Sequence, residues 1–185
     1  MSTRIGKKEK KSYRMALCGI LTALSVVFLM LVPVLPIMLY CAPVLSGLCA
    51  AIAAEEFGVR YSLGVYTASS VLSLLLAADK EAVLVYVLLS GLYPVIRLTV
   101  NGERYKVFKK TAPRIAVKLL LINAGLFAYY FSAVYLFGIP KDSFGSVWVR
   151  WMFLIVGNVI MLLYDRAIGN ALLVYKHKLR PLIVK

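Results

Sequence analysis

Side chains of the kind that enzymes and metal sites use are scarce in this chain of 185 residues. Histidine occurs once, at His177, and only eight residues are acidic. The patterns His-Glu-x-x-His, Cys-x-x-Cys and Gly-x-Ser-x-Gly are absent, and nothing resembles a Walker motif. A catalytic group or a metal ion needs several such side chains at a shared depth. We therefore expect no catalytic residues, no metal and no cofactor.

Cysteine is also rare. Cys18, Cys41 and Cys49 all fall inside apolar runs, and an odd number of cysteines defines no disulfide framework. We interpret the three side chains as small apolar packing residues.

The composition that is present combines two opposing properties. Apolar residues make up 62% of the chain, above the roughly 45–50% of soluble domains, yet the formal net charge is +14. A soluble nucleic-acid-binding protein would not have a mean hydropathy of +0.84. Both values are expected if the chain lies in a bilayer with its basic residues at the edges. The composition predicts an all-α integral protein of the plasma membrane and no nucleic-acid partner.

Six apolar segments are candidates for spanning helices, which need roughly 20 residues to cross about 30 Å of hydrocarbon. The predicted spans, of which the second and fourth are short, are 15–35, 43–54, 61–78, 82–96, 115–137 and 147–164, the last continuing to about 175. The second is expected to start at Pro43, because proline suits a first helical turn. The membrane domain would then occupy residues 14–175, between basic tails at 1–13 and 176–185.

The N-terminus imitates a secretory signal, because basic residues precede an apolar stretch. That stretch runs from Met15 to about Pro43, whereas the core of a cleaved signal has about 7–15 residues, and no small-x-small site ends it. We expect a retained first helix. The segment Pro33–Pro43 after it would form either a re-entrant lid or an ordinary loop.

The basic residues predict the orientation. With the N-terminus inside, six alternating spans place all of the 22 basic residues in the cytoplasm except Lys80, Lys141 and Arg150. Cytoplasmic loops carry such an excess of lysine and arginine. Both termini are therefore expected in the cytoplasm, where the basic face would also attract anionic lipid head groups at about 1 kcal/mol per basic residue.

Polar side chains inside spans are costly in hydrocarbon and so indicate candidate sites. Arg150, Asn158 and Asp165 share a broad face of the sixth predicted helix. Arg150 would face inward in the outer leaflet or snorkel to the surface. The candidate substrate-binding residues, expected to line an outward-opening pocket between the fourth, fifth and sixth helices, are Tyr86, Asn123, Tyr129, Tyr130, Arg150, Trp151 and Asn158.

Structural roles are open for the same groups. Asn123 and Asn158 could hydrogen-bond across packed helices, and the aromatic residues could be interfacial anchors. Asp165 is interpreted as the partner of a cytoplasmic-side base such as Arg97 or Lys118.

Ala16, Gly19 and Ala23 place small side chains on one face of the first predicted helix. Such faces permit close approach of another helix. They would serve either packing within the chain or docking of another membrane protein.

The segment 14–27, RMALCGILTALSVV, resembles the first helix of substrate-binding S components of energy-coupling factor (ECF) transporters. The plan of six helices with both termini inside and a proline-rich loop after the first is similar as well. The ending, in which Gly157-Asn158 precedes Tyr164-Asp165 and a basic tail, also resembles members of that broad group. The likeness covers most of the chain, but its motifs are short and generic.

This resemblance implies a role and partners. S components are the membrane-embedded specificity subunits of vitamin and metal-ion importers, and bind substrate between the outer parts of helices four to six and the loop after helix one. They associate with a transmembrane coupling subunit and two cytoplasmic ATPases. Ala16, Gly19 and Ala23 would correspond to the contact with the coupling subunit, although the central glycine departs from the commoner alanine.

The resemblance also narrows the substrate. Metal-specific members have an additional N-terminal helix with histidine ligands, whereas this chain begins with lysines, so a small organic nutrient is expected. Arg150 would suit a carboxylate or phosphate, and the aromatic residues would suit a ring.

Two other classes stay open. One is a noncatalytic membrane scaffold of the cell-shape MreD type, which shares the six-helix size and would bind no small molecule. The other is an intramembrane enzyme or lipid-handling protein that uses the basic inner face.

Overall fold

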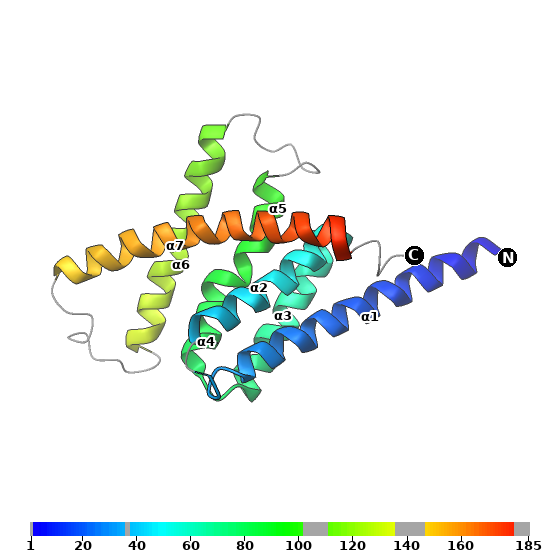
Figure 1. Ribbon diagram of the computed structural model, residues 1–185, viewed down its shortest axis with the longest axis horizontal. Coiled ribbons are helices and arrows are strands. Elements are labelled where there is room, and N and C mark those ends of the chain that lie inside the picture. The colour runs from blue at the N-terminus through cyan, green and yellow to red at the C-terminus, as the bar shows by residue number, and fades with distance from the viewer. Residues whose placement is uncertain (1, 36–37, 102–110, 136–146, 180–185) are drawn as a thin grey trace. The chain divides into compact units, whose positions relative to one another are not determined.

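The computed structural model describes residues 2–35, 38–101, 111–135 and 147–179. Within these ranges every regular element is a helix (Figure 1), which confirms the predicted all-α class. The chain divides into two compact units, residues 1–98 and 99–185.

Four of the described helices contain a stretch long and apolar enough to cross a membrane. These stretches are Ser12–Met30 in α1, Met38–Phe57 in α2, Val59–Leu76 in α3 and Leu154–Lys178 at the end of the chain. A shorter apolar stretch, Ala116–Ser132, lies in α6. Many of their outward side chains are large and apolar, such as Leu75, which is 75% exposed. Stretches of this length and composition are compatible with membrane spans.

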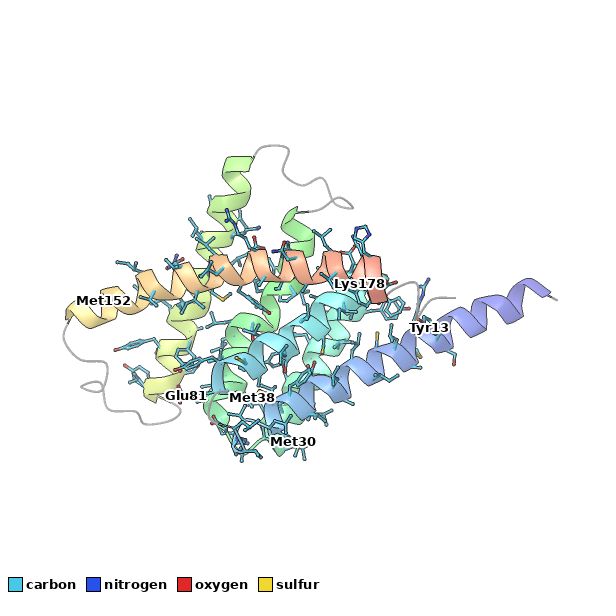
Figure 2. All side chains as sticks on the ribbon, viewed as in Figure 1. Tyr13, Met30, Met38, Glu81, Met152 and Lys178 are labelled. Carbon is cyan, nitrogen blue, oxygen red and sulfur yellow. The ribbon has the colours of Figure 1, made fainter. Side chains whose placement is uncertain are left out.

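The first unit is built on three consecutive helices: α1 (Ser2–Met30), α2 (Met38–Phe57) and α3 (Val59–Leu76). They pack against one another in alternating directions (Figure 1). Met30, Met38 and Glu81 lie at one end of the unit and Tyr13 at the other (Figure 2). At the Tyr13 end, the Tyr13 and Phe57 rings meet edge to face with centroids 6.4 Å apart. The basic beginning of the chain is part of α1 and continues its helix beyond the apolar stretch.

Helix α2 is the central helix of this unit, in contact with α1, α3 and the helical segments α4 (Lys80–Val85) and η1 (Tyr86–Ser90). Its buried side chains are all small: Ala42, Pro43, Ser46, Gly47, Cys49, Ala50, Ala51, Ala53 and Ala54. In a membrane no hydrophobic driving force separates helices from lipid, so close backbone approach over small residues drives association. The composition of α2 allows that approach on several sides at once.

Serine hydroxyls use this close approach to bond backbone carbonyls of the neighbouring helix. Ser25 and Ser46 donate to each other's carbonyl oxygens over 3.3 and 2.9 Å, joining α1 to α2. Ser62 of α3 donates to the Ala50 carbonyl over 2.8 Å. All three serines are fully buried, so each hydroxyl needs such a partner.

The connections are shorter than the sequence predicts. Helix α2 begins at Met38 rather than at Pro43, so Pro43 lies inside the helix and not in its first turn. Residues 38–43 of the expected lid or loop are therefore helical. Gly58 alone joins α2 to α3, and its φ of 90° is a left-handed conformation that glycine adopts without strain.

The fourth predicted helix is divided into three parts. These are α4 (Lys80–Val85), the π-helical turn η1 (Tyr86–Ser90) and α5 (Leu92–Asn101). Asp79 caps α4 by accepting a hydrogen bond from the Ala82 amide over 3.1 Å. The Lys80 ammonium donates to the carbonyls of Leu74 and Ala77 and so satisfies the end of α3.

The second unit contains two long helices, α6 (Thr111–Tyr135) and α7 (Val147–Val174), with a short π-helical turn, η3 (Tyr175–Leu179), at the end of α7. The helices cross (Figure 1). Gly157 lies at the crossing, where a Cβ atom would come within 2.9 Å of the Leu126 methyl groups. The fifth and sixth predicted helices therefore exist, with boundaries a few residues from those expected.

Close packing around α2 leads to a stability prediction. Ala50→Leu puts a larger side chain at a fully buried position, and overpacking of this kind costs about 1–3 kcal/mol. We expect a lower melting temperature in detergent for this variant. The matched control is Val44→Leu on the same helix, where the side chain is 40% exposed. Equal melting temperatures for the two variants would contradict the packing described for α2.

Candidate functional site

The candidate residue Tyr86 lies in the core of the first unit. Its side chain is fully buried against Leu29, Ala42 and Ala82. Its hydroxyl oxygen is 2.6 Å from the Ser69 hydroxyl of α3. Tyr86 therefore has a hydrogen-bond partner and an apolar surround within its own unit.

Tyr86 also begins the π-helical turn η1. The Gly91 amide donates to the Tyr86 carbonyl, five residues back, over 2.7 Å. Tyr66 of α3 donates its hydroxyl to the next carbonyl, that of Val87, over 2.8 Å. The ring centroids of Tyr66 and Tyr86 lie 6.1 Å apart, so Tyr66 contacts the turn from α3 through both its ring and its hydroxyl. A π-turn inside a helix is rare and frequently marks a functional position.

Gly91 fits between these two rings because it has no side chain. A Cβ atom at this position would lie 2.8 Å from Tyr86 Cε2 and 2.9 Å from Tyr66 Cδ2. Both rings are held by their hydroxyl bonds, so neither moves away without losing a partner. The glycine is required here for space, since its φ of −81° suits any residue.

This close contact predicts a difference between two glycines. Gly91→Ala should destabilise the protein by about 1–3 kcal/mol, because the added methyl group displaces a tyrosine ring. Gly64→Ala, on the open side of α3, should be neutral or stabilising by up to about 1 kcal/mol through helix propensity. Thermal unfolding of both variants in detergent measures the difference. An unchanged Gly91→Ala protein would show that the rings do not enclose this position.

In the second unit the structure brings Asn123 and Asn158 together. Each side-chain amide nitrogen donates to the other residue's amide oxygen, over 3.3 and 3.0 Å. Each nitrogen also donates to a carbonyl one turn back on its own helix, Leu119 or Leu154, over 2.8 Å. The four N–H groups of the pair are therefore all used. The pair joins α6 to α7 across the packed helices, which is one of the two roles that the sequence left open.

Lys118 and Asp165 form an ion pair between the same helices, with Nζ and Oδ2 2.8 Å apart. Their side chains are 13% and 18% exposed. The prediction that Asp165 pairs with a base such as Lys118 is confirmed. A charge this far from water needs its partner, because removing one member leaves the other uncompensated.

The other candidate residues have different environments. Tyr129 and Tyr130 are half-buried on α6, two turns from Asn123 along the helix axis. The backbone of Arg150 and Trp151 is part of α7, and the structure does not describe their side chains. Tyr86 belongs to the other unit.

The predicted docking residues Ala16, Gly19 and Ala23 are all exposed on α1. A Cβ atom at Gly19 would meet nothing within 4 Å. The opposite face of the helix, with Leu21 and Ser25, is the one buried in the first unit. Neither α2 nor α3 covers the small-residue face, so packing within this unit does not explain it.

A serine face on α3 was missed by the sequence analysis. Ser62, Ser69 and Ser73 are fully buried and lie four or seven residues apart, on one side of the helix. This spacing in the sequence could have predicted a buried helix face, because lipid-facing positions seldom carry regularly spaced hydroxyls. This face positions Tyr86 through Ser69.

The site groups are neutral hydroxyls and amides together with one ion pair. They are suited to hydrogen-bonding and to packing helices. Among the described residues, no three His, Cys, Asp or Glu side chains are close enough to hold a metal ion. Comparison with known protein families, characterised proteins and solved structures returns no match. The function must therefore be argued from the chain's own residues.

The asparagine pair predicts non-additive substitutions. Asn123→Leu leaves the Asn158 amide without its cross-helix partner, at a cost of about 0.6–1.7 kcal/mol as for interhelical bonds in membranes. The double variant with Asn158→Leu removes both groups and should cost less than the two single variants together. Unfolding in detergent gives the three values. Strict additivity would mean that the two amides act independently.

Proposed function

We propose that this protein is the membrane-embedded substrate-binding subunit of an ECF-type importer for a small organic nutrient, energised by partner ATPases. In this proposal α4, η1 and α5 together form one span, and α6 and α7 each form another. With α1, α2 and α3 these make six spans, which place both termini in the cytoplasm. The basic residues then face the cytoplasm and its anionic lipids.

The small-residue face of α1 is the observation that carries the proposal. Ala16, Gly19 and Ala23 are open on the side of α1 away from its core, while Ile20 and Val27 beside them are 63% and 50% exposed. The small side chains leave the backbone of α1 open to close approach on this face. A transmembrane helix of a coupling subunit would fit this face through close backbone contact.

Substrate recognition in this proposal uses the polar residues of α6 and α7. The N–H groups of Asn123 and Asn158 are all used, so either side chain can donate to a polar ligand only by giving up an existing bond. A ligand that replaced the bonds between the two amides would act on the contact between the two helices. Arg150 would supply a charge for a carboxylate or phosphate.

A second candidate function is the noncatalytic scaffold of the cell-shape type. The observation that favours it is the completeness of the existing hydrogen bonds. Asn123 pairs with Asn158, and Tyr86 pairs with Ser69, so these candidate ligand groups already satisfy one another. A scaffold would use the open face of α1 for a different partner and would carry no small molecule.

The experiment compares two glycines that are equally open. Gly19→Leu adds a large side chain to the small-residue face of α1, and Gly64→Leu adds the same volume on α3. At either position a Cβ atom would meet nothing within 4 Å. We expect Gly19→Leu to fold normally but to lose co-purification of ATP-hydrolysing subunits at least roughly tenfold, which corresponds to about 1.4 kcal/mol of binding free energy. The Gly64→Leu protein should retain them.

ATPase activity of the purified complex and mass spectrometry of its subunits are the measurements. Equal loss in both variants, or equal retention, would contradict docking through α1. Recovery of cell-shape proteins without ATPases, sensitive to Gly19→Leu, would support the scaffold instead.

A further inference from the structure

We propose that the π-helical turn η1 is a joint with two helical registers, and that the Tyr66 hydroxyl is the latch that holds the π register. Tyr66 and the turn both lie in the first unit, and their contacts do not depend on the importer function. Tyr66 is thus a positioning residue for the helix that follows the turn.

Two hydrogen bonds, at the Gly91 amide and at the Val87 carbonyl, define the register of the turn. In an α-helix the Gly91 amide would donate to the Val87 carbonyl, four residues back. Here it donates to Tyr86 instead, over 2.7 Å. The Val87 carbonyl accepts the Tyr66 hydroxyl over 2.8 Å. In hydrocarbon no water can replace a missing donor, so the Tyr66 hydroxyl stabilises the π register directly.

Tyr86 anchors the start of the turn. Tyr86 is fixed by its hydroxyl bond to Ser69 and by its burial in the core. Helix α4 and the turn pack on α2 and α3. The start of the joint is therefore anchored to the three-helix core of the unit.

Loss of the bond between Tyr66 and Val87 would allow α5 to move. If Tyr66 withdraws its hydroxyl, the Val87 carbonyl recovers a donor when Gly91 returns to the α-helical pattern. A π-turn holds one residue more than an α-turn, so the change passes one residue from the turn into the regular helix. As a result α5 turns by about 100° and shifts by about 1.5 Å along its axis. Tyr93 and Val95, which are buried on α5, would change their neighbours. Interfaces that repack in this discrete way are how small local changes become larger ones.

The test uses backbone hydrogen exchange of the full chain in lipid nanodiscs. Tyr66→Phe removes only the latch hydroxyl and should accelerate exchange of the amides in residues 85–92 by roughly tenfold, since a buried carbonyl loses its donor. Tyr61→Phe is the matched control on the same helix, because the Tyr61 ring packs on Phe57 away from the turn. Its exchange should equal that of the unchanged protein.

Deletion of Leu88 gives the decisive comparison. A π-turn holds one residue more than an α-turn, so the deletion closes the ladder as an α-helix and leaves α5 in its original orientation. In that background Tyr66→Phe should have no effect on exchange, because the Val87 carbonyl no longer needs the latch. An equal effect of Tyr66→Phe with and without the deletion would overturn the proposal.

A distance measurement reports the register itself. Spin labels on Val44 of α2 and Ile96 of α5, with the native cysteines replaced, should give one distance in the unchanged protein and in Tyr61→Phe. A second distance should be populated in Tyr66→Phe. If the deletion variant fails to fold, Tyr66→Phe with unchanged exchange and a single distance still refutes the joint.

Discussion

The first unit depends on how closely its helices can approach α2. No buried side chain of that helix is larger than cysteine or proline. The reciprocal bonds between Ser25 and Ser46 join side chain to backbone, and so do the bonds from Ser62 to Ala50. A short serine side chain reaches a neighbouring carbonyl only when two backbones are close. Close approach thus supplies both the dispersion contacts and the hydrogen bonds of the unit. It also holds α3 on α2, and α3 in turn positions Tyr66 beside the turn η1.

A second feature of the structure is that several of the polar candidate side chains bond one another within their own unit. In the first unit Ser69 meets Tyr86, and in the second unit Asn123 meets Asn158. An unpaired group in hydrocarbon costs several kcal/mol, so these pairs define positions rather than leave free binding groups. Any substrate must offer bonds at least as good as those it replaces. Under the importer proposal, specificity would then arise from exchange of hydrogen-bond partners.

The sequence predicted the presence of the helices better than their starting residues and their local hydrogen-bond pattern. The helical class and the apolar stretches followed from composition. The need to compensate a charge predicted a basic partner for Asp165, and the structure selects Lys118 over Arg97 for the ion pair. Pro43 was misplaced because packing on α2 tolerates a proline inside the helix, where local propensity favours a first turn. The π-turn has no periodic signal, since its carbonyl at Val87 depends on Tyr66, which lies in another helix. Residues distant in the sequence decide such features, and hydropathy does not contain them.

The most direct test of the importer proposal is native mass spectrometry of the protein extracted from its membrane with mild detergent. We expect one 20.5 kDa chain bound to a coupling subunit and two ATPases, together with a small organic molecule that is released when the complex is dissociated. The chain alone, or the chain with cell-shape proteins and no small molecule, would contradict the proposed function.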